Sequence, residues 1–317
     1  MSEVLTIGEP MALFAVEKEE DTDKELKDAT SFAKYLAGAE VNVCVGLARL
    51  GHTVDYITQI GQDPYGDFIK DKLASEKIGT AYVSSTDQYF TGSMLKNKVS
   101  KGDPKTFYFR RNSATAHFDA KMIDKINFDG VKIVHLSGIF PALSKECKEA
   151  FARLAKLAHE HGTTITYDPN LRPALWPNQQ VMADVINSFA FQSDIVLPGI
   201  AEGKILAGSD DPDRIADFYL DKGVKTVIVK VGAKGAFIKN KQGSKLVTGY
   251  KVDKVVDTVG AGDGFAVGLI SGLLEELSLE ESVKRGNAIG ALAVMSPGDN
   301  DGYPDRNGLD TFMSRNK

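Results

Sequence analysis

Short runs of apolar, β-branched residues alternate along the chain with longer stretches in which apolar residues recur every three or four positions. The first pattern predicts strands, and it occurs in VLTIG, TVDYITQIG, VKIVHLSG, TTITYDP, DIVLP and KTVIVKVG. The second predicts amphipathic helices, and it occurs in AEVNVCVGLARLG, DPYGDFIKDKLASEKIG, SKECKEAFARLAKLAHEHG and PDRIADFYLDKGV. Near-continuous apolar strands that alternate with helices indicate an α/β fold with a parallel sheet covered on both faces.

Two segments, residues 11–35 and 86–113, break this pattern because apolar and polar residues alternate in them. The second segment contains a KGDP turn at Lys101–Pro104. This alternation predicts antiparallel strands with one wet face, inserted into the α/β body. A small sheet made of two insertions would serve as a lid over a binding site. No repeat or low-complexity linker interrupts the remainder, so we expect a single domain over residues 1–317.

The composition narrows the class of protein. Hydrophobic residues make up 43% of the 317 residues and charged residues 26%, as in ordinary globular proteins. The net charge of −5 argues against nucleic acid or a membrane surface as a partner. Cys44 and Cys147 form no CxxC pair, so neither a disulfide nor a thiolate metal site is indicated. The sequence begins without a signal-peptide pattern, and its run FAVGLISGLL is about half a membrane span. We therefore expect a cytoplasmic protein.

The stretch DTVGAGDGFAVGLISGLL, residues 257–274, concentrates glycines around one carboxylate. Together with KVDKVV before it, the pattern predicts a strand over residues 251–256, a glycine-rich loop and then a helix. Glycines before a helix let a phosphate approach the backbone N–H groups. Asp263 would lie beside that phosphate and stay ionised near the helix N-terminus. An aspartate cap, followed by glycines at every fourth position for close helix–sheet packing, explains the spacing equally well. Neither a P-loop nor a dinucleotide fingerprint fits.

DTVGAGDGFAVGLI resembles the C-terminal signature of the ribokinase-like (PfkB) carbohydrate kinases. GAEVNVCVGLARLG with IGQDPYGDF, residues 38–68, resembles their N-terminal signature. The likeness extends from LTIGEP to the C-terminal helices, and it implies a ribokinase-like three-layer sandwich with a mostly parallel central sheet and a small β-sheet lid. Within the family, YFRRNSATAHF and YDPNLRPALW are similar to 2-keto-3-deoxygluconate kinases. This similarity implies ATP-dependent phosphorylation of the terminal hydroxyl of that sugar acid.

The resemblance also implies roles for individual residues. Asp263 would be the catalytic base. The backbone of Gly260, Ala261 and Gly262 would form an anion hole. Arg172 would lie near the transferred phosphate. The sugar would contact Gly38, Asn42, Tyr108, Arg110 and Asp263. The nucleotide would contact Lys230, Gly232, Gly235, Gly262 and Asn287, and Glu202 would help to organise a metal.

The same resemblance implies ATP as co-substrate, Mg²⁺ as cofactor and assembly into a homo-oligomer. It leaves open whether a monovalent cation is also bound. The chain departs from the family pattern at two positions. Gly199 stands where the family's NxxE element has asparagine, while Glu202 is retained. Some keto-acid kinases also lack that asparagine, so the expectation of magnesium stands. Met94 replaces a frequent aromatic residue, which leaves that side of the sugar pocket undefined.

Simpler structural roles remain open for several of these residues. Arg110 and Arg111 would suit a solvated edge strand, although the forked guanidinium of Arg110 also suits a sugar carboxylate. Arg172 would suit a helix cap or an ion pair between loops, and Gly232–Gly235 an ordinary hairpin turn.

Alternatives also remain for the whole chain. They are a fructokinase or other ketose kinase of the same family, and a non-catalytic sugar- or nucleotide-binding protein on this fold. The retained Asp263 argues against the second alternative, because a binding protein has no use for a proton acceptor there. A dehydrogenase is disfavoured because the first strand ends in GEPMALF rather than in GxGxxG.

Overall fold

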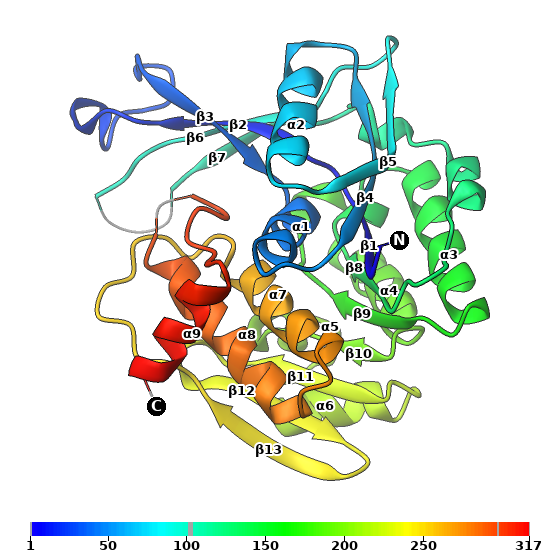
Figure 1. The fold of residues 1–317 in the computed structure, drawn as a ribbon. Coiled ribbons are helices and arrows are strands. Elements are labelled where there is room, and N and C mark those ends of the chain that lie inside the picture. Colours follow the sequence, from blue (N-terminus) through cyan, green and yellow to red (C-terminus); the bar gives the residue numbers. More distant parts are fainter. Residues whose placement is uncertain (1, 101–103, 297, 317) are drawn as a thin grey trace.

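The computed structural model describes residues 2–100, 104–296 and 298–316, and a nine-stranded sheet runs through the described part (Figure 1). Its strands lie in the order β5 (Gly79–Thr86), β4 (Val54–Gly61), β1 (Val4–Ile7), β8 (Ile133–Ser137), β9 (Thr164–Asp168), β10 (Ile195–Val196), β11 (Thr226–Lys230), β12 (Gly235–Asn240) and β13 (Gly243–Thr248). The strands from β5 to β11 pair in parallel, and β12 and β13 continue antiparallel. The predicted, mostly parallel sheet is confirmed.

Helices cover both faces of this sheet, and the sheet separates two buried clusters of apolar side chains. One cluster contains side chains from α1 (Ala39–Arg49), α2 (Pro64–Ser75), α7 (Ala261–Leu274), α8 (Leu279–Val294) and α9 (Arg306–Arg315). The other contains side chains from α3 (Lys145–Glu160), α4 (Gln179–Ala190), α5 (Ile200–Leu206) and α6 (Pro212–Leu220). The expected three-layer α/β sandwich is therefore confirmed. That residues 1–317 form a single domain stays a prediction.

The two predicted insertions form a separate four-stranded sheet, at the upper left of Figure 1. β2 (Met11–Val16) and β3 (Phe32–Ala37) make one antiparallel hairpin, and β6 (Ser93–Lys96) and β7 (Thr106–Phe109) make another. A parallel pairing between β2 and β6 joins the hairpins. The small sheet is as expected, with that one parallel pairing added. Of the predicted KGDP turn, residues 101–103 lie outside the described residues.

One predicted element is wrong. Residues 251–256 form no strand, and α7 begins at Ala261, inside the glycine-rich stretch rather than after it. Val255 and Val256 are exposed, so these β-branched residues have no sheet face to cover. Strand propensity depends on such packing against neighbours, which explains why the local pattern misled. Among the described residues, no helix is long and apolar enough to cross a membrane.

Candidate active site

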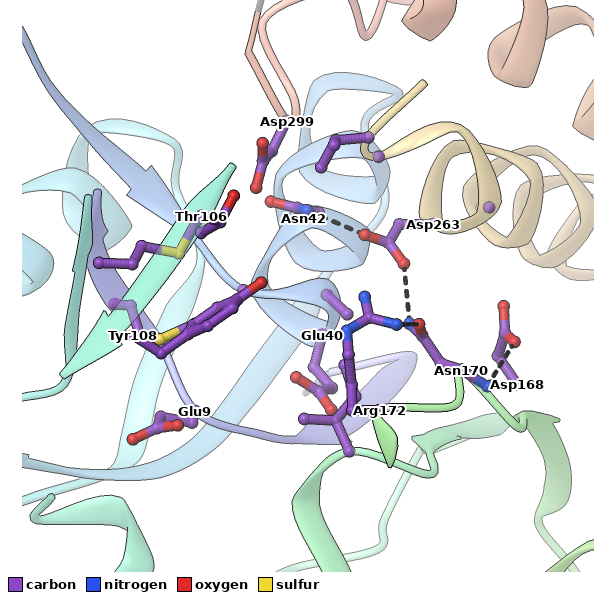
Figure 2. Close-up of a pocket in the computed structure, with 18 of the residues that line it drawn as sticks. Glu9, Glu40, Asn42, Thr106, Tyr108, Asp168, Asn170, Arg172, Asp263 and Asp299 are labelled. Carbon is purple, nitrogen blue, oxygen red and sulfur yellow. Dashed lines mark hydrogen bonds between the residues drawn. The ribbon is translucent and has the colours of Figure 1, made fainter. Parts of the chain in front are cut away.

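A pocket of about 370 Å³ lies at the carboxyl ends of the parallel strands, bordered by the lid sheet (Figure 2). The loops after β1 and β9 and the last residue of β11 reach it, together with the first turns of α1 and α7 and the lid strands β6 and β7. Ligands of open α/β sheets bind at this edge. Its charged and amide side chains are Glu9, Glu40, Asn42, Lys96, Arg110, Asp168, Asn170, Arg172, Glu202, Lys230, Asp263 and Asp299. The lining suits a polar, charged ligand.

Asp263 lies in the first turn of α7, with its carboxylate between two amide side chains (Figure 2). Asn42 donates to Oδ2 over 2.9 Å, and Asn170 donates to Oδ1 over 3.4 Å. The amide of Asn42 is itself held by Asn300, whose Nδ2 donates to its Oδ1 over 2.8 Å. The carboxylate therefore has a defined orientation toward the pocket, as a positioned proton acceptor requires.

Asp263 was expected to stay ionised because it lies at a helix N-terminus, and this expectation is corrected. Burial raises the pKa of Asp263 to about 7, and the nearby Asp168 carboxylate acts in the same direction. The hydrogen bond from Asn42 and the charge of Arg172 lower the pKa but do not offset burial. A carboxyl group with a pKa near neutrality is a stronger base than an ordinary aspartate and is still half ionised at pH 7.

The glycines of the 257–274 stretch fall into two sets with different jobs. Gly264, Gly268 and Gly272 face α8 and its neighbours, where an added Cβ would lie 2.5–3.0 Å from the nearest atoms. They permit close packing of helix on helix, rather than of helix on sheet as expected. Gly262 differs, because a Cβ there would only come into ordinary contact with Lys230 Nζ, 3.5 Å away at the pocket wall. The packing interpretation is thus supported for Gly264, Gly268 and Gly272, while contact of Gly262 with a phosphate stays a prediction.

Gly260 caps the start of α7 in a left-handed conformation, with φ of 79°. A Cβ at Gly260 would lie 1.8 Å from the carbonyl oxygen of Asp299. Only glycine fits this position without strain. Gly260 therefore shapes the turn at the start of α7, where Gly260 and Gly262 line the pocket and the N–H of Ala261 donates to the Thr258 carbonyl over 3.4 Å. An anion at this turn would meet N–H groups that the first turn of a helix leaves without intrahelical partners.

Gly38 and Asn42 border the same pocket from α1. Gly38 precedes the helix with φ of 137°, and a Cβ there would lie 2.5 Å from the carbonyl oxygen of Glu9. The turn can therefore approach the end of β1 only with glycine at this position. Asn42 is buried, and its bond to Asp263 makes it an orienting group for the carboxylate.

The loop after β9 brings Arg172 to the pocket (Figure 2). Asn170 has a left-handed backbone, with φ of 40°, and its side-chain oxygen accepts from Arg172 Nη1 over 2.6 Å. The same Nη1 donates to the carbonyl of Leu171 over 3.0 Å. Arg172 thus makes hydrogen bonds within its own loop, rather than the helix cap or the ion pair between loops that its structural interpretation predicted, and it also lines the pocket.

Tyr108 and Arg110 lie on the same side of the lid, as their spacing predicted. The Arg110 guanidinium is 5.7 Å from the centre of the Tyr108 ring. Arg110 is buried, and its Nε and Nη2 donate to Glu9 Oε2 over 2.6 and 2.5 Å. The solvated edge-strand interpretation is therefore wrong for Arg110 and fits only the exposed Arg111. Part of the Arg110 fork is already occupied by Glu9.

Lys230 and Glu202 form the far wall of the pocket with Asp168. Lys230 Nζ donates to Asp168 Oδ2 over 2.6 Å. Glu202 accepts backbone N–H groups with both oxygens, from Leu171 over 3.0 Å and from Gly199 over 2.7 Å. Burial raises the pKa of Glu202, which the charge of Lys230 opposes. The hydrogen bonds of Glu202 therefore hold the backbone of the loop after β9 and of the start of α5.

The other residues predicted to bind the nucleotide lie outside the pocket lining. Gly232 and Gly235 bound the turn between β11 and β12, with φ of 62° and 105°, which fits the ordinary hairpin interpretation. Asn287, on α8, donates to the carbonyls of Val247 and Thr248 and so joins α8 to β13. These contacts explain their residue types, and nucleotide contacts at these positions stay a prediction.

Several lining residues were missed in the sequence: Glu9, Glu40, Lys96, Asp168, Asn170 and Asp299. Glu9 and Asp168 stand at the ends of β1 and β9, so the rule that placed Arg172 would have found them. Lys96 follows Met94 by two positions on one strand and shares its face. Asp299 has no local signal, because only the tertiary fold brings its loop to Gly260.

A model of the pfkB family carbohydrate kinases matches residues 1–306. The 2-dehydro-3-deoxygluconokinase of Bacillus subtilis (strain 168) is 44% identical over 313 residues, which are 98% of this chain and 95% of the relative. "Probable fructokinase-6, chloroplastic" of Arabidopsis thaliana is 32% identical over 278 residues, covering 85% of this chain and 72% of the relative.

Solved structures agree with the family match. The PfkB protein of Polaromonas sp. JS666 superposes with a TM-score of 0.88 at 38% identity, covering 98% of this chain and 99% of that one. A Ribokinase II structure from E. coli, in complex with ATP and Mg²⁺, superposes with a TM-score of 0.89 at 26% identity, covering 99% of this chain and 100% of that one. The chain therefore belongs to the pfkB family of carbohydrate kinases, with the ribokinase-like fold.

Proposed function

We propose that this protein transfers the γ-phosphoryl group of ATP to the terminal hydroxyl of 2-keto-3-deoxygluconate. The proposal is carried by one arrangement: the Asp263 carboxylate, at the start of α7, shares a pocket with the guanidinium groups of Arg110 and Arg172. A sugar acid needs a proton acceptor at its hydroxyl and cationic groups for its carboxylate and for the phosphoryl group. The similarity to a 2-dehydro-3-deoxygluconokinase supports the same substrate class.

In this mechanism Asp263 accepts the proton of the attacking hydroxyl, while Asn42 and Asn170 hold its two oxygens in place. The N–H groups of Gly260 and Gly262 would form the anion hole, because the first turn of a helix leaves such groups without intrahelical partners. The N–H of Ala261, which the resemblance also assigned to this role, donates to the Thr258 carbonyl over 3.4 Å. Arg172 neutralises charge that develops on the transferred group. Phosphoryl transfer depends mainly on such positioning and charge stabilisation.

ATP would extend from this turn along Lys230 toward the β12 and β13 side, which is where Gly232, Gly235 and Asn287 lie. Magnesium, when bound, would neutralise the phosphates of ATP. The described residues hold no cluster of three or more histidine, cysteine or acidic side chains suited to a metal. This fits Mg²⁺, which commonly uses one or two carboxylates together with substrate phosphates and water. Glu202 would act on the metal through the loop that it holds.

Arg110 is the group that we assign to the sugar carboxylate. Glu9 accepts from Nε and Nη2 of Arg110 and so fixes the plane of the guanidinium. Ser113 also donates to Glu9, which anchors the carboxylate from the segment after the lid. A guanidinium held in one orientation loses little freedom on binding, and its remaining N–H donors can pair with a substrate carboxylate.

A neutral ketose such as fructose is the second candidate substrate. The observation in its favour is the Glu9–Arg110 pair itself, because Glu9 already balances the charge of Arg110. The similarity to a probable fructokinase agrees with this alternative. A non-catalytic binding role has no comparable support. A single domain, cytoplasmic location and homo-oligomeric assembly remain further predictions.

The decisive measurement is the ratio of kcat/KM for 2-keto-3-deoxygluconate to that for fructose. Breaking the buried ion pair by removing only one partner would leave an unpaired charge and destabilise the fold. We therefore choose Glu9→Gln/Arg110→Met, which removes both charges, and Arg111→Met as the exposed control. The double variant should lower sugar-acid kcat/KM by roughly 1.5–3 kcal/mol, about ten- to a hundredfold, as for a lost charged hydrogen bond.

Fructose turnover should barely change in the double variant, and the control should change neither activity. A thermal melt verifies that the double variant is folded. If the unmodified protein prefers fructose, or if both activities fall together, the sugar-acid assignment is wrong. The assignment as a kinase would stand after either of these results.

A further inference from the structure

Lys96 is a buried lysine at the end of the lid strand β6. Its side chain is only 8% exposed, although lysines on small sheets usually point into solvent. Its Nζ lies 2.5 Å from Asp257 Oδ2 and 3.7 Å from Asp299 Oδ1. The strand is held in register by pairing of Lys96 with Ala15 and Thr106. The ammonium group therefore crosses from the lid to two acidic residues outside it.

The two aspartates belong to the segments that build the start of α7. Asp257 Oδ1 accepts from the backbone N–H of Val259 over 3.0 Å, which shapes the turn directly before Gly260. The carbonyl of Asp299 packs against Gly260 itself, and Asp299 borders the upper part of the pocket in Figure 2. Lys96 thus forms ion pairs with Asp257 and Asp299, which both contact the turn proposed to carry the anion hole.

The charges at this junction are unbalanced without the lysine. Asp257 and Asp299 are both largely buried. The Oδ1 atom of Asp299 has no hydrogen-bond partner among the described residues. Burial raises the pKa of Asp299, and the Lys96 ammonium opposes that rise. If Lys96 moved away with the lid, two carboxylates would face each other beside the place where phosphates bind.

We propose that Lys96 is a positioning residue that couples the lid to the phosphate-binding turn, so that the turn holds ATP well only when the lid covers the sugar. The proposal rests on the phosphoryl transfer proposed above. An open lid leaves the carboxylates of Asp257 and Asp299 to repel the phosphates of ATP. A closed lid supplies the ammonium, relieves that repulsion and orders the turn. Binding of sugar and of nucleotide would then reinforce each other.

The test uses Lys96→Met, with Lys98→Met as the matched control. Lys98 follows the same strand and also pairs with an acidic side chain, but its partner Glu19 is exposed and lies in the connection between β2 and β3 rather than beside α7. Lys96→Met should raise the dissociation constant of ATP, measured by calorimetry with sugar present, by about tenfold, a usual size for coupling between two parts of a protein. Lys98→Met should leave it unchanged.

Ammonium or potassium ions supply a second readout that a purely structural role would not change. Added to Lys96→Met, a small cation can take the place of the lost group between the two carboxylates and restore part of the ATP affinity. The double variant Lys96→Met/Asp257→Asn carries less unpaired charge if the single variant folds poorly. It should recover part of the ATP affinity, because one of the two repelling carboxylates is now neutral, and it should gain little more from added cations.

Two failures can be told apart. If the unmodified protein phosphorylates no sugar, the proposed function is wrong. If it does, and Lys96→Met keeps normal ATP affinity while only its melting temperature falls, the lysine is merely structural and the coupling is wrong. Lack of rescue by cations in a folded Lys96→Met protein with weakened ATP binding would also overturn the coupling.

Discussion

Asp263 is the residue whose protonation should govern turnover. Its pKa is raised to about 7 by burial, so in the ligand-free protein a large fraction carries a proton below neutrality. A base must be deprotonated to act, and kcat/KM reports the pKa of the free enzyme. We therefore expect kcat/KM to rise with pH, about tenfold per unit well below pH 7, and to level off above it. Steady-state kinetics across pH 5–9 measures this directly.

Asp263→Asn keeps the shape of the side chain and removes both its charge and its basicity. Turnover should fall by about a hundredfold or more, the usual contribution of a positioned acid–base group, and the remaining activity should lose the rise with pH. Folding should survive, because an amide can still accept from Asn42 at one atom. Turnover near that of the unmodified protein would show that Asp263 is not the base.

At the scale of elements, α7 separates its structural glycines from those open to a ligand. Gly262→Ala places a methyl group in helical geometry, with Lys230 Nζ 3.5 Å away as ordinary contact. Helix propensity then predicts unchanged or slightly higher stability, by about 0.5–1 kcal/mol. Activity should nevertheless fall, because the methyl group occupies space that the transferred phosphate needs. Chemical denaturation and kcat/KM for ATP check the two halves of this prediction.

Gly260→Ala is the matched comparison within the same turn. Its left-handed φ and the 1.8 Å approach of the Asp299 carbonyl make any Cβ costly. Strain of this kind amounts to about 1–3 kcal/mol, so stability should fall together with activity. If Gly262→Ala also lost stability in step with activity, Gly262 would be a packing residue, and the anion-hole assignment would fail.

The sequence predicted the elements whose side chains pack on one sheet. Six apolar runs became β1, β4, β8, β9, β10 and β11, and four amphipathic runs became α1, α2, α3 and α6. The segment 251–256 misled because strand propensity had no partner edge to pair with. The strand β5, partly buried at the edge of the sheet, lacks a strong alternation and was not anticipated.

The candidate site was predictable where one motif contained the geometry, and less so where distant segments meet. The turn around Asp263 was predicted from local spacing, and the lid pair Tyr108 and Arg110 from the resemblance of a short motif. The Glu9 partner of Arg110 is 101 residues away in the chain, and no period in the sequence links them. The raised pKa of Asp263 likewise follows from burial among several segments, which a local helix-dipole argument does not include.

At the scale of the whole molecule, buried carboxyl groups should make stability depend on pH. Burial raises the pKa of Glu40 to about 7, and its Oε1 atom has no hydrogen-bond partner among the described residues. A raised pKa means that the folded state holds the proton more tightly than the unfolded state. This contribution to the free energy of unfolding is complete below pH 4 and is lost as pH rises toward about 7.

Glu40→Gln isolates the effect, because it resembles the protonated side chain at every pH. The variant should be more stable than the unmodified protein at pH 8, by up to about 3 kcal/mol, and the two should converge near pH 4. Comparing the two proteins matters because burial lowers the pKa of His135 to about 4, which gives the opposite slope in both. A stability difference that does not vary with pH, measured by urea unfolding, would contradict this assignment.

The position of β1 has a consequence for synthesis of the protein in the cell. β1 leaves the ribosome before both of the strands that flank it in the sheet, β4 and β8, and β8 begins only at Ile133. At 5–20 residues per second, this apolar strand waits on the order of 10 s for its second neighbour. Its pairing surfaces are exposed to other chains during that interval. We infer that the nascent chain passes through a stage vulnerable to aggregation. In this stage, chaperones that bind extended apolar segments would protect β1.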